Sequence, residues 1–106
     1  MAELLTKPPI LLFTFVNSSQ STSFVPITTN INNLQSSGSC YFNVKNINTG
    51  TGDLLYIKHS SIDHGNNTGF VLDVGESIDI ECGSITNIEI KVPTNKTISF
   101  QVIGYK

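Results

Sequence analysis

Apolar and polar residues alternate along much of the chain with the two-residue period of a β-strand. The alternation is clearest in the last third, in segments 78–81, 88–92 and 98–102, where isoleucine, phenylalanine and valine alternate with polar residues. Such alternation is typical of strands that have one face in a core and the other in solvent. We therefore predict antiparallel sheets in which each strand has one wet face.

Strand-like segments also occur earlier in the chain. They are 10–16, about 24–28, 40–45, 54–59 and 70–74. Pro26 marks the second of these as an edge strand or a bulge, because proline cannot donate a hydrogen bond to a ladder. Polar or turn-forming runs at 17–22, 48–53 and 93–96 are expected to end or connect strands. About eight short strands predict an all-β chain with a single β-sandwich of jelly-roll-like architecture, whose strand order the sequence does not determine.

A length of 106 residues is typical of one domain. The run Lys7-Pro8-Pro9 favours an extended path, because proline excludes helical geometry from the residue before it. We therefore expect an extended N-terminal arm at residues 1–9 and a sandwich at residues 10–106.

Composition supports strands and limits the classes of partner. Isoleucine supplies 13 residues, alanine one and arginine none, so β-formers outnumber helix formers. Without arginine or a basic stripe, and with a net charge of −2, we predict no nucleic-acid partner. The apolar run at 10–16 is too short to span a bilayer and lacks the flanks of a signal peptide. It is interpreted as a strand, and no membrane partner is predicted.

Two cysteines, Cys40 and Cys82, lie in predicted strands. Their number and spacing fit neither a disulfide scaffold nor a metal site. The favoured interpretation is two buried free thiols, which behave as small hydrophobic side chains. The alternative is a bridge between two facing strands.

No group of residues in the sequence has the spacing of a reactive centre. His59, Asp63 and His64, with Asp53 nearby, fit neither zinc nor calcium spacing, so a solvated loop is favoured over a metal site. Serines are numerous, but no G-x-S-x-G elbow is present. Asp79 and Glu81 are expected to share one exposed strand face rather than flank a cleft. We therefore predict no enzymatic activity, no catalytic residues, and no metal or other cofactor.

A sugar-binding sandwich usually presents exposed aromatic side chains, and this chain has no tryptophan. Its tyrosines are Tyr41, Tyr56 and Tyr105, which are candidate surface contacts. Tyrosine at the rim of a sheet is also common without a ligand, so carbohydrate binding remains an alternative.

The second half of the chain resembles a known class of protein. The order is N-T-G at 48–50, a strand at 54–57, G-E-S at 75–77, and then three strands to the C-terminus. This succession, over about residues 43–106, resembles small β-sandwich proteins of tailed-bacteriophage virions, of the capsid decoration (auxiliary) or head-fibre type. The composition, which leans toward Asn, Ile and Lys and has no arginine, also resembles that of proteins from AT-rich genomes such as those of crAss-like phages.

The resemblance implies a non-enzymatic part of the virion, on the capsid surface, assembled in the host cytoplasm. The implied partners are the major capsid protein or other virion proteins, and copies of the chain itself. As contact residues we predict an aliphatic group near the N-terminus: Leu4, Leu5, Ile10, Leu11 and Leu12. Alternatively, 10–16 is simply a core strand and 1–9 a surface tail. The alternative functions are a tail, baseplate, connector or head-fibre adaptor, and a host-surface or glycan-binding module.

Overall fold

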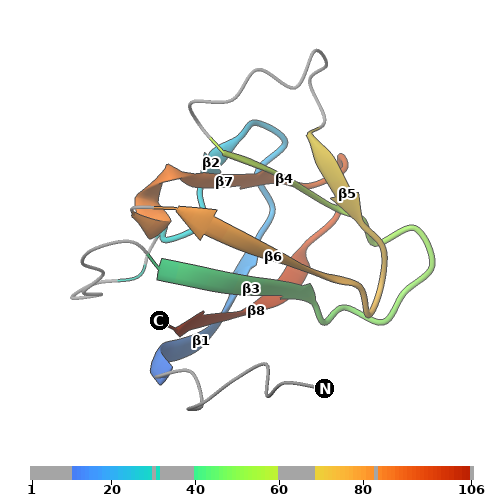
Figure 1. The fold of residues 1–106 in the computed structure, drawn as a ribbon. Coiled ribbons are helices and arrows are strands. Elements are labelled where there is room, and N and C mark those ends of the chain that lie inside the picture. Colours follow the sequence, from blue (N-terminus) through green and yellow to red (C-terminus); the bar gives the residue numbers. More distant parts are fainter. Residues whose placement is uncertain (1–10, 30, 32–39, 60–68, 83, 106) are drawn as a thin grey trace.

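The computed structural model describes residues 11–29, 31, 40–59, 69–82 and 84–105. In this part of the chain, two four-stranded antiparallel sheets pack face to face (Figure 1). The strands are β1 (Leu11–Ser19), β2 (Val25–Pro26), β3 (Cys40–Asn46), β4 (Leu55–His59), β5 (Phe70–Leu72), β6 (Ser77–Cys82), β7 (Ile88–Lys91) and β8 (Ile98–Tyr105). A short 3-10 helix, η1 (Ile85–Asn87), precedes β7. No helix among the described residues has the length and apolar character needed to cross a membrane.

The strand order identifies the type of sandwich. The first sheet has the order β1-β8-β3-β6, and the second has the order β2-β7-β4-β5. The pairs β1–β8, β2–β7, β3–β6 and β4–β5 are antiparallel and nested, like one long hairpin folded over into two layers. This nesting is the connectivity of a jelly roll. The predicted all-β, jelly-roll-like sandwich is confirmed.

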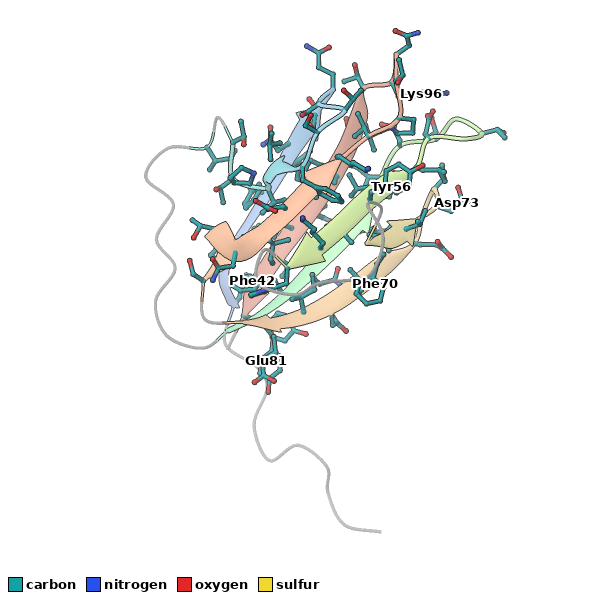
Figure 2. All side chains as sticks on the ribbon, turned by 90° about the horizontal axis from the view of Figure 1, so that it is seen from above. Phe42, Tyr56, Phe70, Asp73, Glu81 and Lys96 are labelled. Atoms are coloured by element: carbon teal, nitrogen blue, oxygen red, sulfur yellow. The ribbon has the colours of Figure 1, made fainter. Side chains whose placement is uncertain are left out.

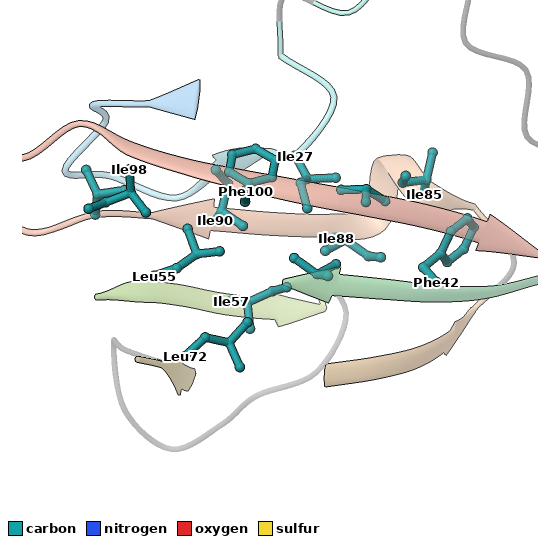
Figure 3. Close-up of a cluster of buried hydrophobic side chains, with 13 residues drawn as sticks. Ile27, Phe42, Leu55, Ile57, Leu72, Ile85, Ile88, Ile90, Ile98 and Phe100 are labelled. Atoms are coloured by element: carbon teal, nitrogen blue, oxygen red, sulfur yellow. The ribbon is translucent and has the colours of Figure 1, made fainter. Parts of the chain in front are cut away.

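The core fills the space between the two sheets (Figure 3). Alternate residues of 88–92 and 98–102 are buried, as predicted from their period. Ile78 and Ile80 are only partly buried, because β6 lies at the edge of its sheet. Complete burial of a valine, leucine, isoleucine or phenylalanine side chain stabilises the fold by about 1.5–3 kcal/mol. The core side chains are Ile27, Phe42, Val44, Leu55, Ile57, Leu72, Ile85, Ile88, Ile90, Val92, Ile98, Phe100 and Val102.

Several strand boundaries differ from those predicted, and two of the differences have a clear physical reason. Residues Asn17 to Ser19 were predicted to end the first strand, but they belong to β1. The reason is that β8 continues beside them, with Ser19 opposite Ile98, and a paired neighbour outweighs a weak intrinsic preference. Conversely, β5 stops at Leu72 instead of residue 74. The chain turns there, with Gly75 at φ 82°.

An aromatic cluster attaches β1 to the rest of the first sheet. The Phe13 ring lies 5.9 Å from the Phe42 ring and 6.1 Å from the Phe15 ring. It also covers Gly104, where a Cβ atom would overlap the ring. Gly104 therefore provides the space in which Phe13 reaches the core.

The backbone register places Cys40 directly opposite Cys82 at the end of the β3–β6 ladder. Both residues lie in strands, as predicted. The facing-strand arrangement that a bridge requires is therefore present in the backbone.

Asn46 is the most deeply buried polar residue of the described core, with no exposed surface. Its side-chain Nδ2 donates to the carbonyls of Asp53 (2.7 Å) and Leu72 (3.0 Å), and its Oδ1 accepts from the N–H of Asn48 (3.0 Å). One amide therefore joins the end of β3 to the chain entering β4 and to the end of β5. This satisfies three backbone groups at the seam between the two sheets.

The adjacent carboxylate of Asp53 holds two turns together. Its Oδ1 accepts from Lys96 Nζ at 2.8 Å, while its Oδ2 accepts from Asn48 Nδ2 (2.8 Å) and from the N–H of Gly50 (2.9 Å). The hydrogen bond from Lys96 is the main cause that lowers the pKa of Asp53, and the bond from Asn48 adds to it. The turn at 48–53 is thereby fixed to the turn at 93–96.

We expect Asp53→Asn to lower the melting temperature at neutral pH and to make the melting temperature less dependent on pH in the acidic range. A carboxyl with a lowered pKa in the folded state stabilises the fold above its unfolded pKa of about 3.9, and this stability is lost as pH falls through the folded pKa. Thermal unfolding followed by circular dichroism from pH 7 to pH 2 checks this. The two melting curves should converge toward pH 2, and a constant difference across the range would contradict the assignment.

Candidate binding face on the first sheet

Four residues form one row across the outer face of the first sheet. Leu11, Tyr105, Tyr41 and Glu81 are successive neighbours on β1, β8, β3 and β6. The adjacent row, from Phe13 to Ile80, packs against the core, so the first row points outward. We call these four residues the tyrosine row. Leu11 is 63% exposed and Tyr41 is 43% exposed, so the end of the row away from Glu81 is apolar.

The two tyrosines in the middle of the row form a stacked pair. Their ring centroids are 5.8 Å apart and their planes differ by 20°. The strand register produces this pair, because Tyr41 and Tyr105 lie directly opposite each other on β3 and β8. Stacked aromatic rings on neighbouring strands stabilise a sheet and present a flat apolar surface.

Carboxylates of β6 accept hydrogen bonds from the two tyrosine hydroxyls. The charge of Glu81 and its hydrogen bond with the phenol raise the pKa of Tyr41. Burial raises the pKa of Tyr105, with a further contribution from the charge and hydrogen bond of Asp79. Both phenols therefore remain protonated at neutral pH and donate hydrogen bonds. Figure 2 shows Glu81 extending away from the sandwich, at the opposite end from Lys96.

The outer face is apolar on one side and polar on the other. Val16 of β1, which is 59% exposed, continues the apolar side two rows from Leu11. On the polar side, Asp79 also accepts a hydrogen bond from Asn43 Nδ2 at 2.9 Å. The face therefore has apolar contact surface next to a group of hydrogen-bond acceptors.

The predicted contact residues are only partly described. Leu4, Leu5 and Ile10 lie outside the described residues, as does the side chain of Leu12. Leu11 is exposed at the outer end of the tyrosine row. Phe13 and Phe15 of the same strand pack against the core. β1 is thus a core strand on one face and a candidate contact strand on the other.

The residues considered for a metal site do not converge in the described part of the chain. Asp53 binds Lys96, and His59 ends β4, opposite Ile88. Asp63 and His64 lie outside the described residues. Within the described ranges, no three His, Cys, Asp or Glu side chains lie close enough to hold a metal ion. Asp79 and Glu81 share one exposed strand face, as predicted.

The outer face of the second sheet has a different character. Lys58 Nζ lies 4.6 Å from the centre of the Phe24 ring, and Lys91 Nζ lies 5.0 Å from it. Lys91 also lies over Tyr56, at 5.5 Å. Cations cover these rings, so Tyr56 does not form an open aromatic surface like the tyrosine row.

A hollow of about 460 Å³ lies between the end of β1 and β2. Residues 17–21 line one side with hydroxyl and amide groups, while Ile27 and Ile90 are among the residues that close it. No residue in its described lining is ionisable. It offers hydrogen bonds to a ligand but no acid or base of its own.

The sequence predicts Tyr41 and Tyr105 as separate surface contacts and gives no sign that they pair. The two residues are far apart in the sequence, and only the adjacency of β3 and β8 brings them together. Their alternation with buried neighbours was the available signal for an outward direction. No protein-family model and no curated protein matches the chain.

Proposed function

We propose that the chain is a non-enzymatic structural protein of a tailed-phage virion, a capsid auxiliary protein that binds the lattice of the major capsid protein. The observation that carries this proposal is the exposed apolar end of the tyrosine row, at Leu11 and Tyr41. Leu11 is one of the contact residues predicted from the aliphatic group near the N-terminus. Its exposure leaves it available to a partner.

The chemistry of this face suits a protein partner. Tyrosine is enriched at protein interfaces because it buries a large area with little loss of side-chain freedom. Burying an exposed leucine contributes about 1.5–3 kcal/mol. Such a contact is modest for one copy, but copies that also touch each other on a lattice gain from multivalency.

The fold is compatible with this role without establishing it. Jelly rolls occur in viral capsid proteins and in lectins. The same fold carries many functions, so the assignment has to rest on the face itself.

We expect Leu11→Asp to reduce the number of copies on the particle at least tenfold. The substitution removes the apolar contact and places a charge in the interface. The combined loss of binding free energy exceeds the roughly 1.4 kcal/mol that corresponds to a tenfold change in affinity. The measurement is quantitative mass spectrometry of purified virions, with the major capsid protein as the internal standard.

Val71→Asp is the matched control, because Val71 is 45% exposed on β5 of the second sheet. It should leave the number of copies unchanged. Normal occupancy of the Leu11→Asp chain would show that this face is not the contact. A wild-type chain missing from virions would contradict the proposed function, and a location on the tail would favour the adaptor alternative.

One observation favours a glycan-binding module as the second candidate. The stacked pair of Tyr41 and Tyr105 lies beside the carboxylates of Asp79 and Glu81, which can accept hydrogen bonds from sugar hydroxyls. A glycan array comparing the wild-type chain with Tyr41→Ala tests this. Binding that disappears in the variant would support the second candidate over the first.

A further inference from the structure

The four sheet edges of the described fold differ in how well they are protected against pairing with another strand. β2 has two residues, one of them proline, and β5 has three residues. β6 carries Asp79 and Glu81, so two copies of it would repel each other. Short strands, proline and charge are the usual means of protecting an edge.

The fourth edge, β1, has none of these protections. It is nine residues long, its sequence LLFTFVNSS contains no charge and no proline, and among the described strands it pairs only with β8. Its one register shift lies between Leu11 and Phe13, before the regular segment 14–18. Figure 1 shows it at the outer side of the first sheet. A long, uncharged edge of this kind is a template for another strand.

The register identifies the backbone groups that β1 offers. The N–H of Ile47 donates to the carbonyl of Ser99 at 3.1 Å. The backbone N–H and C=O groups of odd-numbered β8 residues therefore point toward β3, and those of even-numbered residues point toward β1. In β1 the backbone groups of odd-numbered residues consequently point toward β8, and those of Thr14, Val16 and Ser18 point toward the open edge. The N–H of Ser18 is already bonded to Asn17 Oδ1 at 2.9 Å.

The other two edge-facing residues are Thr14 and Val16. Within the part of the chain that the structure describes, the backbone N–H and C=O groups of these two residues have no partner at the edge. Two β1 strands arranged antiparallel about Phe15 place Thr14 of each copy opposite Val16 of the other. This register satisfies all of these groups with four hydrogen bonds and leaves the Ser18 bond intact.

We infer that two copies of the chain pair through β1, antiparallel and symmetric about Phe15, to form a continuous eight-stranded sheet. The side chains agree with this register, because Thr14 and Val16 are both β-branched and both point to the outer face. A pairing of identical edges closes as a two-fold dimer and leaves no further edge of this kind open. The inference concerns the chain in solution and does not depend on the proposed virion role.

The test compares wild type with Val16→Pro by sedimentation over a range of concentrations. Wild type is expected to shift toward about 23 kDa, twice the 11.5 kDa of one chain, as concentration rises. Proline removes the N–H of residue 16 but is tolerated where that N–H points away from the sheet, so the variant should stay folded and monomeric. Val16→Thr keeps the N–H and should still form dimers.

A second pair of variants does not depend on proline being tolerated. Val16→Lys places a charge at the edge, whereas Gln101→Lys places the same charge on the neighbouring strand of the same face. Only the first should weaken dimer formation, at least tenfold. A wild-type chain that stays monomeric at every concentration, or a folded Val16→Pro chain that stays dimeric, would overturn the inference.

Discussion

Replacing Asn46 with leucine is expected to lower the free energy of unfolding by about 3 kcal/mol or more. Leucine has a similar size but no polar atoms. The carbonyls of Asp53 and Leu72 and the N–H of Asn48 would lose their partners. Leaving a buried polar group without a hydrogen bond costs about 1–3 kcal/mol for each group. The site has no exposed surface, so water cannot replace the amide without a rearrangement.

Urea unfolding of purified wild type and variant measures this loss. Asn43→Leu is the matched control, because Asn43 lies on the same strand but bonds Asp79 on the outer face. We expect the control to change stability by about 0.5–1 kcal/mol. Equal losses in both variants would show that the bonds of Asn46 do not join the two sheets as described.

Asn46 also shows what the sequence pattern reveals and where it stops. Phe42 and Val44 alternate with Tyr41, Asn43 and Lys45, a pattern that indicates the inward face of β3, and both are fully buried. Residue 46 falls on the same inward register, yet it is an asparagine. A polar residue at a core position is a signal for a buried hydrogen-bond site. Its partners come from β5 and from the chain before β4, and no local pattern identifies them.

The candidate binding face was less predictable than the core, for a related reason. Alternation shows that Tyr41 points away from the core, but it does not show which strands are neighbours. For Leu11 alternation is misleading, because Phe13 and Phe15 of the same parity pack against the core and only a register shift between Leu11 and Phe13 leaves Leu11 exposed. Pairing in a jelly roll joins the first strand to the last, so Leu11 and Tyr105 meet from opposite ends of the chain. The edge position of β1 also follows from strand order and not from its own residues. Sequence pattern therefore predicts faces, while the three-dimensional fold determines neighbours and edges.

Phe42→Ala is expected to lower the free energy of unfolding by about 3–5 kcal/mol, the usual loss when a buried aromatic ring is removed from a core. Phe42 has no exposed surface and lies on β3, which is an interior strand of its sheet. A domain of this kind is typically stable by about 5–15 kcal/mol, so the variant would lose a large part of its stability. Urea unfolding measures the loss.

Tyr41→Ala is the control, because it removes an aromatic ring from the adjacent residue on the opposite face. We expect it to cost only about 0.5–1.5 kcal/mol, the contribution of its stacking with Tyr105. The Phe42 variant should also speed hydrogen exchange in β1, since the Phe13 ring that attaches β1 to the core rests against Phe42. Similar losses in both variants would contradict the assignment of faces on β3. If exchange in β1 did not change, that strand would be anchored by its ladder with β8 and not by the aromatic cluster.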